Sequence, residues 1–299
     1  MSRLAIFASY DKQGIVHDYV ISYLKRLKRV SDKIIFIADN HTKDEEKQKL
    51  NGLVEFCSFA PHGEYDFGSY KRGYQYAMQQ GLLETTDELI LCNDSCFSVM
   101  DFNNIFSKMK KKECDFWGLS ENKSPVRHLQ SYFLVFKKNV FKNKEFSNWI
   151  QTIKRQDNSC NVIQNYEIPL TSFCENIGFK SNAFIKHQEK TNPTVKPLAL
   201  LKQHMPLIKR KVFISREACE ESARQLLIVL HKKDKDSYKD ICNYFKINWS
   251  KLFPLIHPRD FEVLKRFFYQ KKITKSDKLC IKICKIPLPI NFLGRTNSK

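Results

Sequence analysis

The sequence lacks any long uninterrupted hydrophobic run and has few residues that break regular structure. No window of its 299 residues approaches the roughly 20 consecutive apolar residues that a membrane-spanning helix needs. Only 9 Gly and 10 Pro are present, whereas 42% of the residues are hydrophobic and 13% are aromatic. This composition excludes a fibrous repeat and an intrinsically disordered chain. We therefore expect a folded globular protein of one large or two modest domains.

Signals for export and for structural zinc sites are also missing. Residues 1–10 lack the basic region, the apolar region and the small-residue cleavage site of a secretory signal, so we expect a cytoplasmic protein. The two closest cysteine pairs, Cys92/Cys96 and Cys280/Cys284, are separated by three residues instead of the two that are typical of zinc knuckles. We expect the ten cysteines to be reduced thiols.

Positive charge is what the chain has in excess. Its 51 Lys and Arg against 32 Asp and Glu give a formal net charge of +19, and residues 216–299 alone hold 19 Lys and Arg against 9 Asp and Glu. The basic residues follow no zinc-finger, RNA-binding or helix-turn-helix pattern, so nucleic-acid binding is the less favoured interpretation. Between residues 271 and 288, lysines interleave with Leu and Ile. This pattern favours peripheral attachment to an anionic membrane surface, with an ordinary solvated helix or strand edge as the alternative.

The hydrophobic pattern predicts an α/β fold with a mostly parallel sheet flanked by helices. Short apolar runs alternate with amphipathic stretches of helical spacing, as in chains of β-α-β units. The expected strands are 4–8, 33–38, 53–59, 88–92, 114–119, 131–136 and 179–184. We expect one domain over residues 1–215 and a basic, mainly helical extension over 216–299. Ligands of such sheets bind beyond the carboxyl ends of the strands, where Asp11, Asp39 and Asp94 fall.

A glycine-containing helix start is the strongest local feature. Residues 62–73 hold three glycines and the basic pair Lys71 and Arg72. Gly63 and Gly68 would let the backbone approach a ligand closely, and free amides at a helix N-terminus favour anions. The alternative is a turn with a solvated Lys-Arg pair.

Two carboxylates occupy positions suited to chemistry. Asp94 ends a buried apolar run between Asn93 and Ser95, where a divalent cation that bridges phosphates could bind; the alternative is a turn with Asp94 as a helix cap. Pro169 is typical of the first turn of a helix, which places Glu167 at or just before a helix start. Glu167 is there either a cap or a general base.

Five of these segments, in order along the chain, resemble the rhamnan synthesis protein F family. They are residues 10–16, 65–73, 91–96, 115–118 and 128–133, and the resemblance covers roughly residues 1–215. The family consists of bacterial glycosyltransferases of cell-surface polysaccharide assembly. The resemblance implies transfer of a sugar to a lipid-linked acceptor of O-antigen, capsule or rhamnan synthesis. The family's name points to rhamnose as the sugar, and dTDP-rhamnose would then be the donor.

The order of motifs is also similar to that of the inverting family 2 glycosyltransferases, which implies a GT-A-like fold. By that likeness Ser9, Tyr10, Asp11 and Asp39 hold the nucleotide base and ribose, and Asp94 holds Mg²⁺ or Mn²⁺. The acidic turn of this chain offers one carboxylate where the family usually has two. The further donor-binding residues that we expect are Asp66, Gly68, Lys71, Arg72, Asn93, Asp94, Lys209 and Arg210.

The same likeness assigns the catalytic base to Glu167, with Glu121 as the runner-up. Ile168 follows Glu167 where the family often has a second acid, so Glu167 would act alone. Direct displacement with this base inverts the anomeric centre. We expect Trp117, His128 and Gln130 to bind the acceptor; the alternatives are a core or pocket-wall position for Trp117 and a structural, hydrogen-bonded His128. The alternative for the whole chain is a noncatalytic scaffold that keeps the transferase fold.

Overall fold

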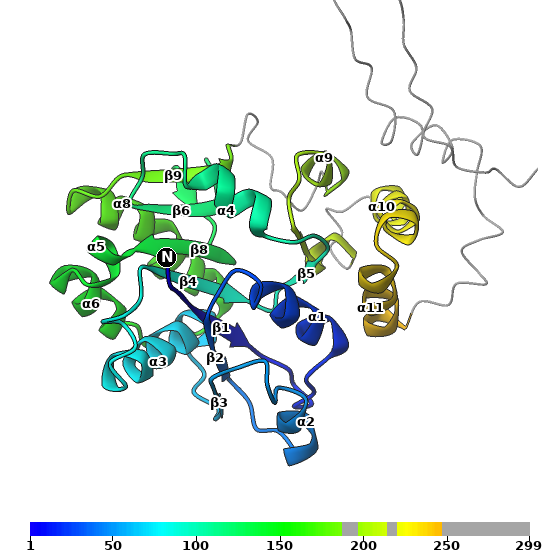
Figure 1. Ribbon diagram of the computed structural model, residues 1–299, viewed down its shortest axis with the longest axis horizontal. Helices are drawn as coiled ribbons and strands as arrows, with labels where there is room; N and C mark the ends of the chain where they lie inside the picture. The colour runs from blue at the N-terminus through cyan, green and yellow to red at the C-terminus, as the bar shows by residue number, and fades with distance from the viewer. Residues whose placement is uncertain (187–196, 214–219, 247–299) are drawn as a thin grey trace, which may run out of the picture. The chain divides into compact units, whose positions relative to one another are not determined.

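The central sheet is built around the first buried strand of the chain (Figure 1). In the computed structural model, which describes residues 1–186, 197–213 and 220–246, β1 (Arg3–Ser9) lies between β2 (Lys33–Ala38) and β4 (Glu88–Asn93). Both neighbours run parallel to β1. The strand order is β3-β2-β1-β4-β8-β6-β7, and β9 pairs with β6.

The outer strands make the sheet mixed. They are β3 (Phe56–Phe59), β6 (Phe116–Asn122), β7 (His128–Leu129), β8 (Phe133–Lys137) and β9 (Ser181–Ile185). β3 and β9 pair in parallel with their neighbours, whereas β8 runs antiparallel between β4 and β6. The predicted class, a mostly parallel α/β sheet flanked by helices, is confirmed. A small separate sheet, which the sequence did not reveal, pairs β5 (Cys96–Ser98) with β10 (Leu207–Lys209).

The helices connect the strands and cover the sheet. They are α1 (Asp18–Leu27), α2 (Asp44–Gln48), α3 (Tyr65–Gln79), α4 (Asn103–Met109), α5 (Lys138–Phe141), α6 (Lys144–Gln151), α7 (Ser159–Val162), α8 (Ile168–Asn176), α9 (Pro197–Lys202), α10 (Glu220–Lys233) and α11 (Lys235–Phe245). A π-helical turn, Ile163–Glu167, joins α7 to α8, and a 3₁₀ turn, Arg210–Phe213, follows β10.

Successive side chains of β1 bury themselves in opposite layers. Ile6 faces α3, where a Cβ on Gly73 would lie only 2.4 Å from the Ile6 Cγ2 atom, so this glycine permits the close approach of helix and strand. Phe7 faces the other side, and its ring centroid is 5.1 Å from that of Tyr23 in α1. Because both faces are covered, the strand is almost continuously apolar, as its sequence indicated.

Helices α10 and α11 follow the last strand, and α11 packs against α1. Arg26 of α1 donates to Asp234 at 2.6 Å and to Ser237 at 2.9 Å. The division of the chain at residue 215 stays a prediction. The lysine-rich segment 271–288 lies outside the described residues. Within the residues that the structure describes, no helix is both long and apolar enough to cross a bilayer.

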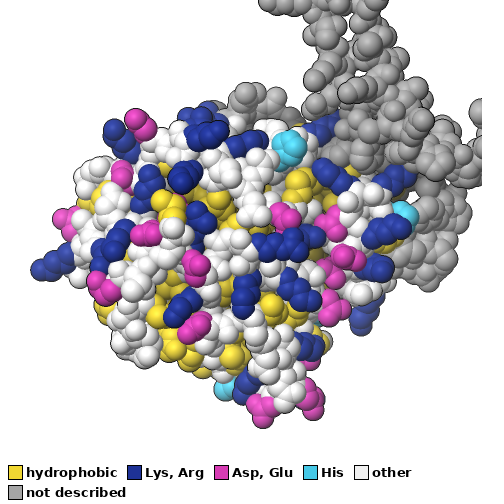
Figure 2. Space-filling model, in the orientation of Figure 1, with side chains coloured by type: hydrophobic (Ala, Val, Ile, Leu, Met, Phe, Trp, Pro, Cys, Tyr) yellow, Lys and Arg dark blue, Asp and Glu magenta, His cyan; other side chains and the backbone are white. Residues whose placement is uncertain are grey.

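Surface charges of both signs are mixed on the face seen in Figure 2, where Lys and Arg side chains alternate with Asp and Glu. Exposed ion pairs occur among the described residues, such as Arg29 with Asp101 at 2.6 Å. Pairs of this kind contribute little to stability, about 0–1 kcal/mol each.

Candidate functional site

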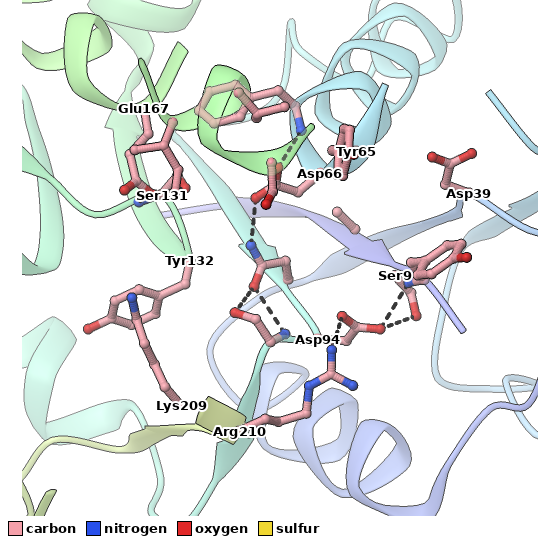
Figure 3. A pocket seen from close by; sticks show the side chains of 18 of the residues that line it. Ser9, Asp39, Tyr65, Asp66, Asp94, Ser131, Tyr132, Glu167, Lys209 and Arg210 are labelled. Atoms are coloured by element: carbon pink, nitrogen blue, oxygen red, sulfur yellow. Dashed lines mark hydrogen bonds and ion pairs between the residues drawn. The ribbon is translucent and has the colours of Figure 1, made fainter. Parts of the chain in front are cut away.

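A cavity of about 370 Å³ opens at the carboxyl ends of the central parallel strands, where the sequence predicted a ligand site (Figure 3). Ser9 ends β1, Asp39 directly follows β2, and Asn93 ends β4. The residues that line the cavity are Ala8, Ser9, Tyr10, Asp39, Tyr65, Asp66, Phe67, Asn93, Asp94, Ser95, Ser131, Tyr132, Ser159, Val162, Ile163, Glu167, Lys209, Arg210 and Lys211.

Glu167 belongs to one side of this cavity and is held by a neighbouring serine. It ends the π-helical turn, and Pro169 lies in the first turn of α8, as predicted. Glu167 makes no capping hydrogen bond with its side chain. Its Oε2 instead accepts hydrogen bonds from the backbone N–H of Ser131, at 2.9 Å, and from the Ser131 hydroxyl. Single π-helical turns inside helices occur frequently at functional sites.

Behind Glu167 lies His128, which is 1% exposed. Its Nε2 is 3.8 Å from Glu167 Oε1, and its Nδ1 is 2.8 Å from the carbonyl oxygen of Val126. Because a carbonyl can only accept, Nδ1 carries a proton and Nε2 faces the carboxylate. We expected His128 to bind the acceptor. In the structure it lies next to Glu167 but does not line the cavity.

Asp66, in the first turn of α3, is the second carboxylate on this side. Its Oδ2 accepts from the amide of Asn93 at 3.0 Å, and its Oδ1 accepts from the backbone N–H of Phe67 at 3.0 Å. Burial and the nearby Glu167 charge raise the pKa of Asp66 to about 6. We call Asp66 and Glu167 the acidic wall of the cavity.

Asp94 is surrounded by donors from the protein itself. Its Oδ2 accepts from the Ser9 hydroxyl at 2.8 Å and from the backbone N–H of Tyr10 at 2.9 Å. Its Oδ1 lies 3.6 Å from Nη2 of Arg210, and Figure 3 shows the carboxylate between these partners. Burial raises the pKa of Asp94 above its ordinary value, against the effect of the guanidinium.

Pairing of β10 with β5 brings the basic segment to the acidic turn. The backbone N–H of Arg210 donates to the Ser95 carbonyl at 2.8 Å, and its Nη1 donates to the Tyr19 and Tyr244 hydroxyls at 3.0 and 2.8 Å. Burial disfavours its charge, but Asp94, Tyr19 and Tyr244 together outweigh burial and raise the pKa of Arg210 above its ordinary value. The Lys209 ammonium lies 4.9 Å from the centroid of the Tyr132 ring. We call Lys209 and Arg210 the basic wall.

The surroundings of Asp94 leave little room for the predicted Mg²⁺ or Mn²⁺ ion. Both oxygens of Asp94 already face donors or a guanidinium, and Arg210 stands where a cation bound to Oδ1 would be. Mg²⁺ that bridges phosphates is usually held by one or two carboxylates together with phosphate oxygens and waters, so it needs an accessible carboxylate oxygen. The described part of the chain contains no cluster of three His, Cys, Asp or Glu side chains suited to a metal. The residues around Asp94 therefore do not fit such an ion.

Several predicted donor-binding residues lie outside the cavity lining. Lys71 and Arg72 form ion pairs with Glu64 at 2.7 and 2.8 Å. Gly68 packs on the same glutamate, because a Cβ there would be 2.2 Å from Glu64 Cβ. Asp11 binds within its own turn, and its Oδ2 is 3.1 Å from His17 Nε2. Lys71 and Arg72 thus share one carboxylate, Glu64, at the start of their own helix.

Asp39 does line the cavity, but its carboxylate organises the loop ahead of α3. Its Oδ1 accepts from the Gly63 backbone N–H at 2.9 Å, and its Oδ2 lies 3.5 Å from Nδ1 of His62. Gly63 has φ of +67°, a left-handed conformation that favours glycine. Asp39 therefore fixes the cavity edge through this glycine turn.

The remaining expected residues are buried beside the cavity. Glu121 pairs with Arg127 at 2.9 Å, the Trp117 ring lies 5.2 Å from that of Phe106, and Gln130 accepts from Ser120 at 2.7 Å. Glu121, Trp117 and Gln130, which the sequence predicted at the site, do not line the cavity. The core position was one of the alternatives for Trp117.

Several lining residues were not singled out from the sequence, Tyr65, Ser131 and Tyr132 among them. Tyr65 is 38% exposed and has φ of +57°, a strained conformation of the kind that clusters at functional sites. Ser131 donates to Glu167, and the Tyr132 ring lies near the Lys209 ammonium. All three stand inside segments that carry the family resemblance, and this is the only sequence signal they give, because their roles depend on residues far away in the chain.

A mostly parallel α/β sheet with a polar cavity at its strand ends defines a class of ligand-binding proteins. Within this class, the chain belongs to the rhamnan synthesis protein F family, whose model matches residues 34–286. The family predicted from the sequence is thus confirmed. The matched range continues past residue 215, where the resemblance was expected to end, and includes α10 and α11.

Two curated relatives are similar over part of their length. An uncharacterized protein y4gN of Sinorhizobium fredii is 24% identical over 181 residues, which cover 59% of this chain and 46% of that protein. The virulence protein VirA of Vibrio anguillarum is 29% identical over 181 residues, which cover 60% of this chain and 58% of that protein. The chain spans about half the length of the curated relatives it matches.

Solved structures of transferases are similar at low identity. A cytidylyltransferase from Leptospira borgpetersenii matches with 11% identity and a TM-score of 0.43, over 82% of this chain and 94% of that one. Core-mannan synthase A from Aspergillus fumigatus, in an Mn/GDP form, matches with 11% identity and a TM-score of 0.31, over 50% and 63% of the two chains. Similarity at this level carries no statement about the substrate or metal of this chain.

Proposed function

We propose that this protein is a glycosyltransferase that uses a nucleotide-sugar donor. The observation that carries the proposal is the opposition of two walls in one cavity, with the serine-held Glu167 on one side and Lys209 and Arg210 on the other. Such a cavity suits a reaction in which a proton is accepted at one end and negative charge develops at the other.

The proposed reaction is a direct displacement at the anomeric carbon. An acceptor hydroxyl forms the new C–O bond while Glu167 accepts its proton. The bond from the anomeric carbon to the diphosphate oxygen breaks, and its electron pair leaves with the nucleoside diphosphate. The basic wall stabilises the charge that develops there. Attack opposite to the leaving group inverts the anomeric configuration.

The family description supports rhamnose as the sugar, and we propose dTDP-rhamnose as the donor. A surface-polysaccharide precursor on a lipid carrier is the proposed acceptor. Attachment of the enzyme to an anionic membrane surface would bring it to that acceptor, and a nucleic acid is not a proposed partner. The proposed donor contacts within the cavity are Ser9, Tyr10, Asp39, Asp66, Asn93, Asp94, Lys209 and Arg210.

A donor screen followed by a transfer assay tests this function. We expect dTDP-rhamnose, within a panel of nucleotide sugars, to raise the melting temperature, since ligands that bind only the folded state stabilise it. Release of nucleoside diphosphate should then require an acceptor and should be lost in Glu167→Gln with donor binding retained. If no nucleotide sugar binds and none is turned over, the proposal fails and the noncatalytic scaffold is favoured.

A further inference from the structure

Arg210 is fixed from several sides before any ligand enters. Its backbone N–H bonds to the Ser95 carbonyl, and its Nη1 donates to hydroxyls from two separate helices, Tyr19 of α1 and Tyr244 of α11. Tyr19 in turn donates to the backbone carbonyl of Asp94 at 3.1 Å. The guanidinium is 5.8 and 5.5 Å from the centroids of the Tyr19 and Tyr244 rings. The side chain is thus an anchored cation rather than a solvated surface arginine.

The anchoring leaves hydrogen-bonding capacity for an anion. A guanidinium has five N–H donors, and the two tyrosines take two of them. Charge-assisted bonds from arginine to phosphate are short and strong, and they are frequently bidentate. Lys209 and Lys211, on either side in the sequence, line the same cavity. A phosphate that enters at this wall therefore meets cations from one short segment.

Asp94, in contrast, offers little to a metal ion. Ser9 and Tyr10 saturate one oxygen, and the other faces the guanidinium at 3.6 Å. A divalent cation at that oxygen would lie beside a like charge that Tyr19 and Tyr244 hold in place. The expected metal site does not agree with these contacts. The reason is that the Arg210 guanidinium already occupies the position of the cation.

We propose that Arg210, assisted by Lys209, is the resident cation that binds the donor's diphosphate without a divalent metal, with Tyr244 as its positioning residue. Asp94 then serves to orient the guanidinium. The inference rests on the proposed function, because that function supplies a nucleoside diphosphate as the ligand. It also gives α11 a part in the site, although Tyr244 does not line the cavity.

Calorimetry on the full chain tests the inference with dTDP, UDP, GDP, CDP and ADP, each measured in EDTA and again in Mn²⁺. For the nucleotide that binds, we expect affinities in the two conditions to agree within about three-fold. Binding that appears only with Mn²⁺ overturns the inference but leaves the proposed function standing. Absence of binding in both conditions, for all five nucleotides, overturns the two together.

Variants then locate the cation. Arg210→Met should weaken diphosphate binding in EDTA by about 10- to 100-fold, as expected for loss of hydrogen bonds between charged groups. Arg29→Met, which removes an exposed arginine paired with Asp101, is the matched control and should bind like the parent. Equal affinities of Arg210→Met and Arg29→Met would overturn the role of Arg210.

Tyr244→Phe separates positioning from general stability and also serves if Arg210→Met does not fold. It should weaken binding of the diphosphate by about 3- to 10-fold but leave the corresponding nucleoside monophosphate unaffected. A merely structural role would lower both affinities alike, and that result would overturn the assignment of Tyr244.

Discussion

The acidic wall and the basic wall differ in how their charges are held. Glu167 and Asp66 accept hydrogen bonds from neutral donors, Ser131 and Asn93. Arg210 is tied to a carboxylate and to two phenol groups. Burial and the charge of Glu167 raise the pKa of Asp66, whereas Asp94 and the two tyrosines raise the pKa of Arg210 and keep its guanidinium charged. The difference suggests chemistry at one wall and binding at the other.

The largest effect that sharpens this contrast is expected from Glu167→Gln. Loss of a general base lowers turnover by about 100- to 10,000-fold. The amide keeps the shape of the carboxylate, so donor affinity should stay near that of the parent. Steady-state transfer kinetics combined with calorimetry check both values. The contrast breaks if donor affinity falls as far as turnover does.

A smaller effect on turnover should follow from removal of one hydrogen bond to Glu167. Ser131→Ala removes the hydroxyl that donates to Glu167 but keeps the backbone N–H bond. We expect turnover to fall by about ten-fold, in line with one hydrogen bond to a charged group. Ser172→Ala, which alters an exposed serine of α8, is the control and should behave like the parent. Indistinguishable turnover in the two variants would show that the Ser131 hydroxyl does not contribute to the action of Glu167.

The buried Asp66 should make the stability of the protein depend on pH. Its pKa is about 6 in the folded chain, above the value of about 3.9 for an unfolded Asp. The folded state therefore binds the proton more tightly, and stability falls as pH rises from about 4 to 6. Asp66→Asn lacks this loss, so its melting temperature should gain on the parent by a few degrees across that window. If the melting temperatures of the parent and of Asp66→Asn change in parallel from pH 4 to 7, the raised pKa of Asp66 is contradicted.

The smallest effect is expected outside both walls. Lys71→Met and Arg72→Met remove cations that pair with Glu64, away from the cavity lining. Diphosphate affinity should change by less than about two-fold. Binding measured beside Arg210→Met provides the scale. If diphosphate affinity falls as far as it does in Arg210→Met, the phosphate binds at the start of α3. Lys71 and Arg72 would then be equivalent to Lys209 and Arg210 as phosphate ligands.

The sequence indicated the scaffold well because its signals are local. Apolar runs marked the parallel strands, and Pro169 marked the helix start beside Glu167. Assignment of the two basic pairs was harder. Lys71 and Arg72 looked like phosphate ligands, but both pair with Glu64, which stands at the N-cap position of the same helix. Composition and spacing alone gave no sign of which pair would keep its charge for a ligand.

Long-range pairing explains most of what could not be predicted. Strands β5 and β10 have three residues each and lie far apart in the chain, so neither produces a periodic pattern. Their pairing alone carries Arg210 to Asp94. The contact of Tyr244 with Arg210 likewise joins segments that the sequence divides at residue 215. Register between distant short elements is set by tertiary packing, which local propensity does not encode.

The β5–β10 pairing also has a consequence for biosynthesis. Chains fold from the N-terminal end as they leave the ribosome. The strands, the acidic turn and Glu167 are all synthesised before β10 exists, and Tyr244 follows later still. A nascent chain can thus build its sheet and its proton acceptor while the phosphate-facing side is still untranslated. Arg210 gains its contact with Tyr244 only when the last described helix has been made, so a prematurely terminated chain that lacks α11 should bind the diphosphate more weakly than the full chain.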